Sequence, residues 1–260
     1  MLANTVRTRG VTFAFIIGPP RFVAREEASR VHNAVCDATG HDDLAFRYSP
    51  IDTPQRRGPD GFQIVIGRQE GRGGFQIIDE LNPTQFSGLR LLIRYDWPPS
   101  QEHVEQLADQ TVNAVLDAMD GDWQRVMAEV RFRAECNVAG DDALAYVRDG
   151  LCRLRPATLE NLGNPLTFCS LSVEISEAVH DNEPLANPKR EVRIEVLRDD
   201  PRLAYIETVN QWNQAPPRTS VQLSELDRLR SFEQNPSDYI NDSYDFLTER
   251  VLALGDPGGD

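Results

Sequence analysis

Apolar residues follow two different periods along this chain. Three stretches, 89–97, 126–136 and 191–197, alternate between apolar and charged positions, the pattern of a strand with one buried face. Four other stretches, 24–38, 104–119, 144–154 and 240–254, carry apolar residues every three or four positions, which predicts amphipathic helices. Shorter runs rich in β-branched and aromatic residues predict further strands, at 11–17, 62–66, 75–78, 168–176 and 203–212.

The predicted elements occur in the same order twice. Residues 11–119 and 126–253 each read as strand, helix, three strands and helix. Val11 and Val126 open the two copies, and Trp97 and Trp212 close the last strand of each, with the same offset (126 − 11 = 115 and 212 − 97 = 115). Because a Pro-Pro pair follows each tryptophan, we interpret the chain as an internal duplication, although few residues are identical between the copies.

Local signals mark where several elements begin and end. Gly40 predicts the end of the first helix, Ser100 predicts an N-cap, and Pro236 predicts the start of the last helix. The glycine-rich segment 67–74 predicts a hairpin turn, since no helix follows that could present a phosphate loop. The polar segments 49–61 and 218–235 predict an exposed loop and a linker.

These elements predict an α+β fold built from a duplicated β-α-β-β-β-α unit. The two repeats, 1–120 and 121–260, would form two domains or one continuous domain, with a mostly antiparallel sheet of about eight strands and the helices on one face. This pseudo-two-fold layout resembles the saddle of TATA-binding-protein-like folds. The resemblance concerns the fold alone, because similar folds carry unrelated functions.

Charge argues against nucleic acid as a partner. The net charge is −14, of which −10 falls after residue 120. The predicted open face carries charges of both signs, as in Glu129, Arg131, Arg133 and Glu135, which favours cross-strand ion pairs over phosphate binding. No apolar run approaches the length of a membrane span. Arg7 and Arg9 precede an apolar stretch as in a signal peptide, but the stretch is short and has no small-residue cleavage site before Pro19-Pro20, so we reject that interpretation. We therefore expect an acidic, soluble, cytoplasmic protein that binds neither membranes nor nucleic acid.

Residues with catalytic or metal-binding potential do not form a known pattern. The four cysteines, at 36, 136, 152 and 169, lack the spacing of a zinc site and are too few for a disulfide scaffold. Cys36 and Cys152 near helix ends are expected to be buried, inert thiols. No histidine belongs to HExxH and no serine to GxSxG. We therefore predict no catalytic residue, no metal and no cofactor, and leave enzymatic activity open while favouring its absence.

The remaining candidates for binding are aromatic and cationic. Paired aromatic residues at equivalent strand ends could line a pocket at the pseudo-two-fold axis, and Arg68 and Arg72 belong to a local excess of positive charge. The candidate ligand-binding residues are Tyr95, Trp97, Tyr205, Trp212, Arg68 and Arg72. We expect a non-catalytic interaction or scaffold protein that binds another protein or self-associates through its sheet. The alternative is a small-ligand-binding protein or an uncharacterised enzyme that uses the cleft between the repeats.

Overall fold

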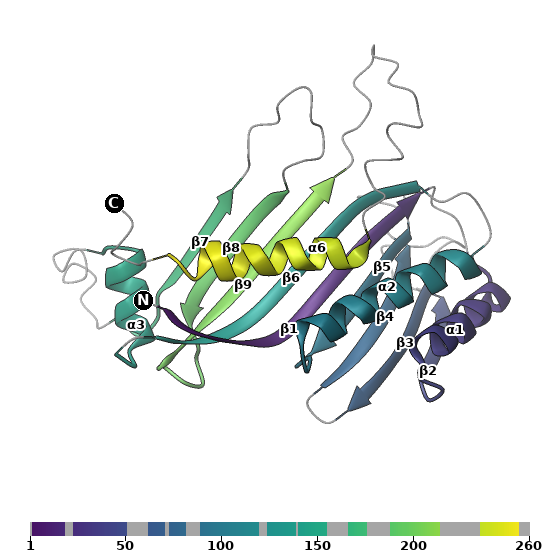
Figure 1. The fold of residues 1–260 in the computed structure, drawn as a ribbon, viewed down its shortest axis with the longest axis horizontal. Helices are drawn as coiled ribbons and strands as arrows, with labels where there is room; N and C mark the ends of the chain where they lie inside the picture. Colours follow the sequence, from purple (N-terminus) through teal and green to yellow (C-terminus); the bar gives the residue numbers. More distant parts are fainter. Residues whose placement is uncertain are drawn as a thin grey trace, which may run out of the picture.

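The computed structural model describes ten segments of the chain, which contain all the elements discussed below (Figure 1). The described residues are 2–18, 23–50, 62–70, 73–81, 89–119, 124–138, 140–154, 166–175, 188–213 and 235–254. The first half contains β1 (Leu2–Gly18), α1 (Arg25–Thr39), β2 (Ala45–Pro50), β3 (Phe62–Glu70), β4 (Gly73–Leu81), β5 (Leu89–Asp96) and α2 (Gln101–Ala118). The second half contains β6 (Gln124–Val138), α3 (Ala143–Ala145), η1 (Tyr146–Leu151), β7 (Ser170–Ile175), β8 (Lys189–Val196), β9 (Leu203–Asn213), α6 (Pro236–Asp245) and η2 (Phe246–Val251).

The nine strands form one antiparallel sheet in the order β2-β3-β4-β5-β1-β6-β9-β8-β7. The first strand of each half, β1 or β6, lies at the centre. Outward from this pair, the first half continues with β5, β4 and β3, and the second half with β9, β8 and β7. The prediction of an α+β protein with an antiparallel sheet is confirmed, while the duplication itself stays a prediction.

Strand β2 adds a ninth strand that the sequence pattern did not predict. It pairs with β3 from Ala45 to Pro50 and overlaps the start of the stretch expected to be an exposed loop. Its polar residues and terminal proline suit an edge position, because proline cannot donate to a ladder. Residues 51–61 of that predicted loop, and 218–234 of the predicted linker, lie outside the described residues.

The central strands match the predicted alternation most closely. On β6, Ala128, Val130, Phe132, Ala134 and Cys136 are buried while the charged residues between them are partly exposed. Strand β1 is longer than expected, because it starts at Leu2 and pairs with β6 through two register shifts before Val11. The sequence placed the strand start at Val11, since the preceding Arg7 and Arg9 lowered the apolar signal.

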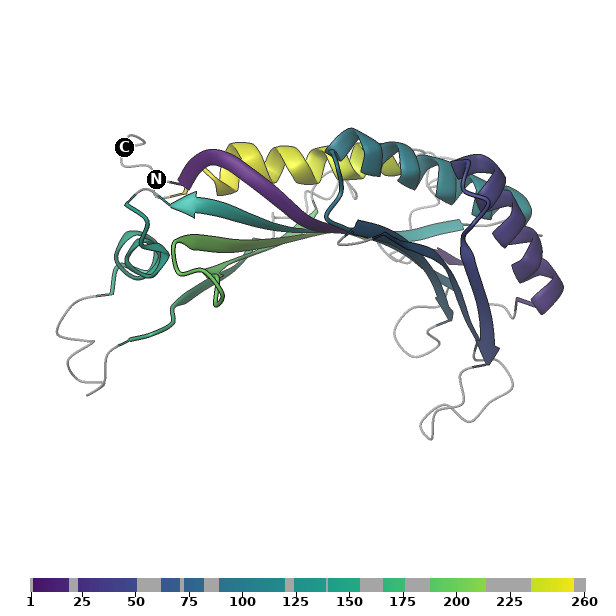
Figure 2. The ribbon, with the colours of Figure 1, turned by 90° about the horizontal axis from the view of Figure 1, so that it is seen from below.

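The helices α1, α2 and α6 cover one face of an arched sheet (Figure 2). Both edges of the sheet turn toward the opposite side, so the helices lie on the convex face and the concave face is open in this view. The buried stripes of α2 and α6 pack onto the central strands to form the core. Burial of this apolar surface is the dominant favourable term in folding.

Helix boundaries follow the predicted caps in three places. Gly40 ends α1 with φ of 68°, the Oγ of Ser100 accepts from the backbone N–H of His103, and Pro236 is the first residue of α6. The predicted helix at 144–154 differs, because only Ala143–Ala145 is α-helical and the chain continues as the π-helix η1. Gly150 within this segment weakens an α-helix, since glycine is a poor helix former.

Polar contacts join the two helices that come from different halves. The carboxylate of Asp109 in α2 accepts from the backbone N–H of Ser237 at the start of α6. Gln101 at the start of α2 donates to Asn241 in α6 at 2.7 Å. An acidic side chain at the first turn of a helix is favourable because it meets the positive end of the helix dipole. These contacts hold the first turns of α6 against α2.

Candidate functional site

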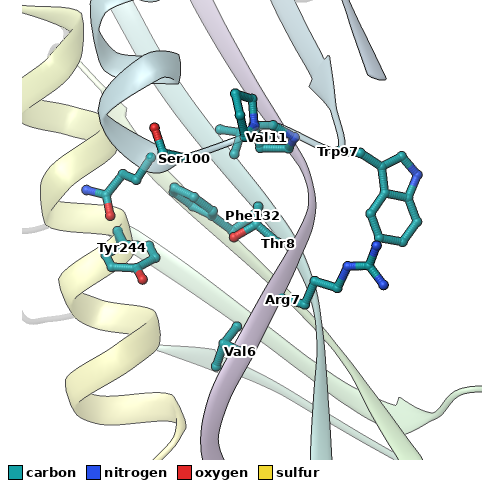
Figure 3. A pocket seen from close by; sticks show the side chains of 11 residues that line it. Val6, Arg7, Thr8, Val11, Trp97, Ser100, Phe132 and Tyr244 are labelled. Carbon is teal, nitrogen blue, oxygen red and sulfur yellow. The ribbon is translucent and has the colours of Figure 1, made fainter. Parts of the chain in front are cut away.

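A pocket of about 380 Å³ lies between the two halves of the chain on the helix side of the sheet (Figure 3). Thr8 on β1 and Ser100 before α2 line it from the first half. Phe132 on β6 and Tyr244 on α6 line it from the second half. Its volume falls within the range of small-molecule sites, which are typically about 300–1,000 Å³.

The pocket combines an apolar base with hydroxyl groups at its rim. Val11 and Phe132 are 1% exposed and form the base, and Figure 3 shows Tyr244 and Thr8 on either side of Phe132. Tyr244 packs on Phe132 with ring centroids 5.9 Å apart. Such a lining suits a small molecule with an apolar body and one or two polar groups.

Trp97 lines the pocket and has a strained backbone conformation. Its φ is 55°, the left-handed region that is uncommon for a bulky residue. The ring packs against the guanidinium groups of Arg7 and Arg9, at 4.7 and 5.1 Å from the ring centroid, and its backbone N–H donates to the carbonyl of Arg9. The turn therefore directs the indole away from the side of the sheet predicted for it, toward the N-terminal part of β1.

The structure separates the four aromatic residues that we predicted to line a common pocket. Trp212 is 8% exposed and packs in the core against Tyr239. Tyr95 faces α2, with its ring centroid 5.6 Å from that of His103. Tyr205 lies on the concave face, where its hydroxyl donates to Glu207 at 3.0 Å. Of the four residues only Trp97 lines the pocket, so their shared role at a central axis has no geometric support.

The other two candidate binding residues are Arg68 and Arg72. Arg68 belongs to β3 and is paired with Phe75 of β4, in the hairpin that the glycine-rich segment predicted. Arg72 lies outside the described residues. Val6, Arg7, Thr8 and Tyr244 line the pocket but were missed by sequence reasoning, although Val6 and Thr8 alternate with two arginines in the pattern of a strand.

Oppositely charged side chains pair across the concave face, as the sequence predicted. Arg133 on β6 donates to Asp96 on β5 at 2.9 Å and passes over β1, which lies between these strands. Gly10 is the β1 residue opposite both of them. A Cβ on Gly10 would lie 2.5 Å from the Arg133 guanidinium, so the absence of a side chain there leaves the space for this ion pair.

Further ion pairs continue along the same face. Glu135 accepts from Arg7 at 3.4 Å and lies 3.7 Å from Arg9, and Lys189 lies 3.0 Å from Glu174 on the neighbouring strand. Burial and the neighbouring Glu207 raise the pKa of Tyr205 to about 12.

The edge strand β7 is the most exposed strand at this end of the sheet. Leu171, Val173 and Ile175 lie opposite Ile194, Val192 and Arg190 of β8, so they share the helix side of the sheet. Val173 is 38% and Ile175 40% exposed. In the part of the chain that the structure describes, no strand pairs with the outer side of β7, and its ladder groups form a template for another strand.

The described residues contain no cluster of three or more His, Cys, Asp or Glu side chains able to hold a metal ion. Among the helices in the same ranges, none combines the length and hydropathy needed to span a bilayer. No model of a known protein family matches the chain, and neither does any curated protein.

Proposed function

We propose that this protein is a non-catalytic interaction protein that self-associates through the outer edge of β7. The observation that supports this most is the exposure of Val173 and Ile175, which are two of the three exposed large apolar side chains in the described residues. Natural edge strands are protected by lysine, proline or bulges. Strand β7 has no lysine, proline or bulge, and its one charged residue, Glu174, is paired with Lys189 of β8. Strand β2 at the opposite edge ends in Pro50.

A second copy of the same strand complements β7. In an antiparallel pair centred on Ser172, Leu171 of each chain faces Val173 of the partner subunit, and Glu174 faces Ser170 of the partner subunit. A pair centred on Val173 also keeps the apolar residues together and sets Glu174 opposite a serine. Because directly opposed like charges destabilise a sheet, the absence of a Glu–Glu pair in either register favours a dimer of identical chains.

Sedimentation velocity over a range of protein concentrations tests this proposal. The wild-type chain should shift from monomer to dimer as concentration rises. Val173→Lys should remain monomeric, because it places a charge within the apolar side of the new pair. The matched control is Leu254→Lys, since Leu254 has a similar exposed fraction, 40% against 38% for Val173, but lies three residues beyond the end of η2.

The lysine variants separate pairing from general charge effects. Each reduces the net charge from −14 to −13, so each weakens overall repulsion between copies. Loss of the dimer in Val173→Lys but not in Leu254→Lys would support a contact at β7. A wild-type chain that stays monomeric at every concentration, or two variants that sediment alike, would refute the proposal.

The second candidate function is small-ligand binding in the pocket, and the observation that favours it is the lining from both halves of the chain. Thr8 and Ser100 supply hydroxyl groups, and Arg7 supplies a cation near the opening. Together with the apolar base, they suit an organic acid with an apolar body. Arg7 is already in contact with Glu135 and Trp97, which limits the charge that it offers.

Fluorescence titration with anilinonaphthalene sulfonate, an anion with aromatic rings, tests the pocket. The dye should bind the wild-type chain, and Thr8→Trp should abolish binding because the indole would fill the cavity. The control Thr167→Trp adds the same side chain at an exposed position. Equal dye binding by the wild type and both variants would exclude this pocket as the site.

Two further proposals concern the origin of the two halves of the chain and the location of the protein in the cell. We propose that residues 1–120 and 121–260 are duplicated repeats that form one continuous domain, which the mirrored strand order around β1 and β6 supports. We also propose a cytoplasmic location, since all four cysteines are free thiols in the structure and the cytosol keeps thiols reduced.

A further inference from the structure

Two cysteines of the second half meet beside the exposed edge of the sheet. Cys152 follows η1 as its C-terminal cap, and Cys169 immediately precedes β7. Their sulfur atoms are 3.7 Å apart, although the residues are 17 positions apart in the sequence. Cys152 is only partly buried, which corrects the expectation that its thiol is buried.

The other two cysteines have different surroundings. Cys36 is 7% exposed and lies 3.4 Å from the Nε2 atom of His32. Cys136 is 1% exposed, and its thiol donates to the carbonyl of Asn137. A disulfide needs two sulfur atoms that can approach to about 2.0 Å. The observed contact of 3.7 Å between Cys152 and Cys169 requires only a small movement to meet that condition.

We propose that Cys152 and Cys169 form a redox-active pair that a peroxide converts into an intramolecular disulfide. The thiolate of Cys152, the more accessible of the two, attacks one oxygen of hydrogen peroxide. The O–O bond breaks, which leaves a sulfenic acid on Cys152 and releases hydroxide that takes up a proton as water. Cys169 then attacks the Cys152 sulfur, the S–O bond breaks, and a second water leaves. Two thiols lose two electrons and two protons, and one peroxide is reduced to two waters.

The surroundings of Cys152 and Cys169 determine how fast we expect peroxide to oxidise the pair. Burial and the adjacent Cys169 raise the pKa of the Cys152 thiol. Because the thiolate is the attacking species, the reaction is slow at neutral pH and accelerates as pH rises. The pair should therefore become oxidised during prolonged exposure to peroxide, and not during a brief exposure.

The disulfide would join η1 to the start of β7 and close the intervening chain into a ring. A crosslink of this kind restricts the unfolded chain, so we expect the oxidised protein to have a higher Tm than the reduced protein. This inference does not depend on self-association, because the bridge forms within one chain and is measured without reference to oligomeric state.

Thiol counting and peptide mapping test the proposal on the full chain treated with hydrogen peroxide. After denaturation, the reduced protein should show four thiols and the oxidised protein two, since one bridge consumes two of the four. Trypsin should release residues 149–153 linked to residues 154–189, because cleavage after Arg153 separates the two cysteines and Pro156 protects Arg155. Dithiothreitol should restore all four thiols.

Two substitutions make the outcome specific. Cys152→Ser should retain its three thiols after the same treatment, whereas Cys36→Ser should form the 152–169 bridge and retain one. Four free thiols in oxidised wild type, a bridge that includes Cys36 or Cys136, or a bridge only between two chains would each overturn the proposal. The wild-type peptide map decides the matter even where a variant fails to fold.

Discussion

Gly10 and Arg133 form the clearest coupling between single residues on the concave face. Gly10 leaves room for the Arg133 guanidinium, which crosses β1 to reach Asp96. In other strand positions, replacing glycine by alanine is favourable by about 0.5–1 kcal/mol, because glycine has more backbone freedom to lose on folding. At position 10, the same substitution would also displace the partly buried ion pair between Arg133 and Asp96, which lowers stability.

A double-mutant cycle measures this coupling. We expect Gly10→Ala to lower the free energy of unfolding by about 1 kcal/mol, since it disrupts hydrogen bonds between charged groups. In the Arg133→Ala background the same substitution should be neutral or stabilising, because nothing remains to displace. Urea unfolding of the four proteins gives the coupling energy. Equal effects of Gly10→Ala in both backgrounds would show that Arg133 does not occupy the space above Gly10.

The stability of the protein should depend on pH through two tyrosines, the buried Tyr146 and the partly buried Tyr205. Burial raises the pKa of Tyr146 and Tyr205 to about 12 in the folded protein, against about 10 for an unfolded chain. Their contribution is therefore fully present below about pH 10 and is lost as pH rises toward 12, because the unfolded chain releases these protons first. Urea unfolding at pH 9 and pH 11 should show a smaller loss in Tyr146→Phe and Tyr205→Phe than in wild type. A loss of equal size in all three proteins would contradict these pKa shifts.

Arg190 adds polar contacts between helix α6 and the sheet to the apolar packing of the core. Arg190 on β8 donates to Asn210 on β9 at 3.0 Å and to Asp242 on α6 at 2.9 Å. Its guanidinium also lies 4.4 Å from the centroid of the Phe246 ring. Asn210 is fully buried, so removal of Arg190 takes away a partner from a polar group that water cannot reach easily.

Replacement of this arginine should have a larger effect than replacement of its neighbour on the opposite face. We expect Arg190→Ala to lower the free energy of unfolding by about 2 kcal/mol, because charge-assisted hydrogen bonds to a buried partner are lost. Arg193→Ala, three residues along β8, removes the ion pair between the half-exposed Arg193 side chain and Glu195 and should lower it by less than about 1 kcal/mol. Thermal or urea unfolding compares the two variants. Equal losses of unfolding free energy would show that the contacts of Arg190 with Asn210 and Asp242 add no special stability.

Sequence periodicity predicted the elements that have one buried face. Strand β6 and helix α2 match, because their apolar positions recur at the spacing that burial demands. The two-residue pattern continues through Val6, Arg7 and Thr8, but its apolar signal is weak, so β1 was predicted too short. The pocket was missed for a different reason, since it depends on the left-handed turn at Trp97 and on contacts between residues more than 100 positions apart.

At the scale of the whole molecule, an arched sheet has its helices on one face and paired charges on the other. The core and the helix contacts stabilise a scaffold, and the outer edge of β7 remains available for pairing in the described part of the chain. Exposed apolar residues on an edge strand favour strand addition over catalysis. We therefore propose that β7 extends the sheet with a second copy of the same chain.

Amide hydrogen exchange of residues 170–175 at low and high protein concentration tests this claim most directly. Outer amide groups of β7 exchange freely in a monomer, and pairing with another strand protects them. We predict that protection in this segment rises with concentration, while β6 at the centre of the sheet stays equally protected throughout. Exchange in 170–175 that is independent of concentration would show that β7 does not pair with a second copy. A concentration-dependent change confined to another segment would have the same meaning.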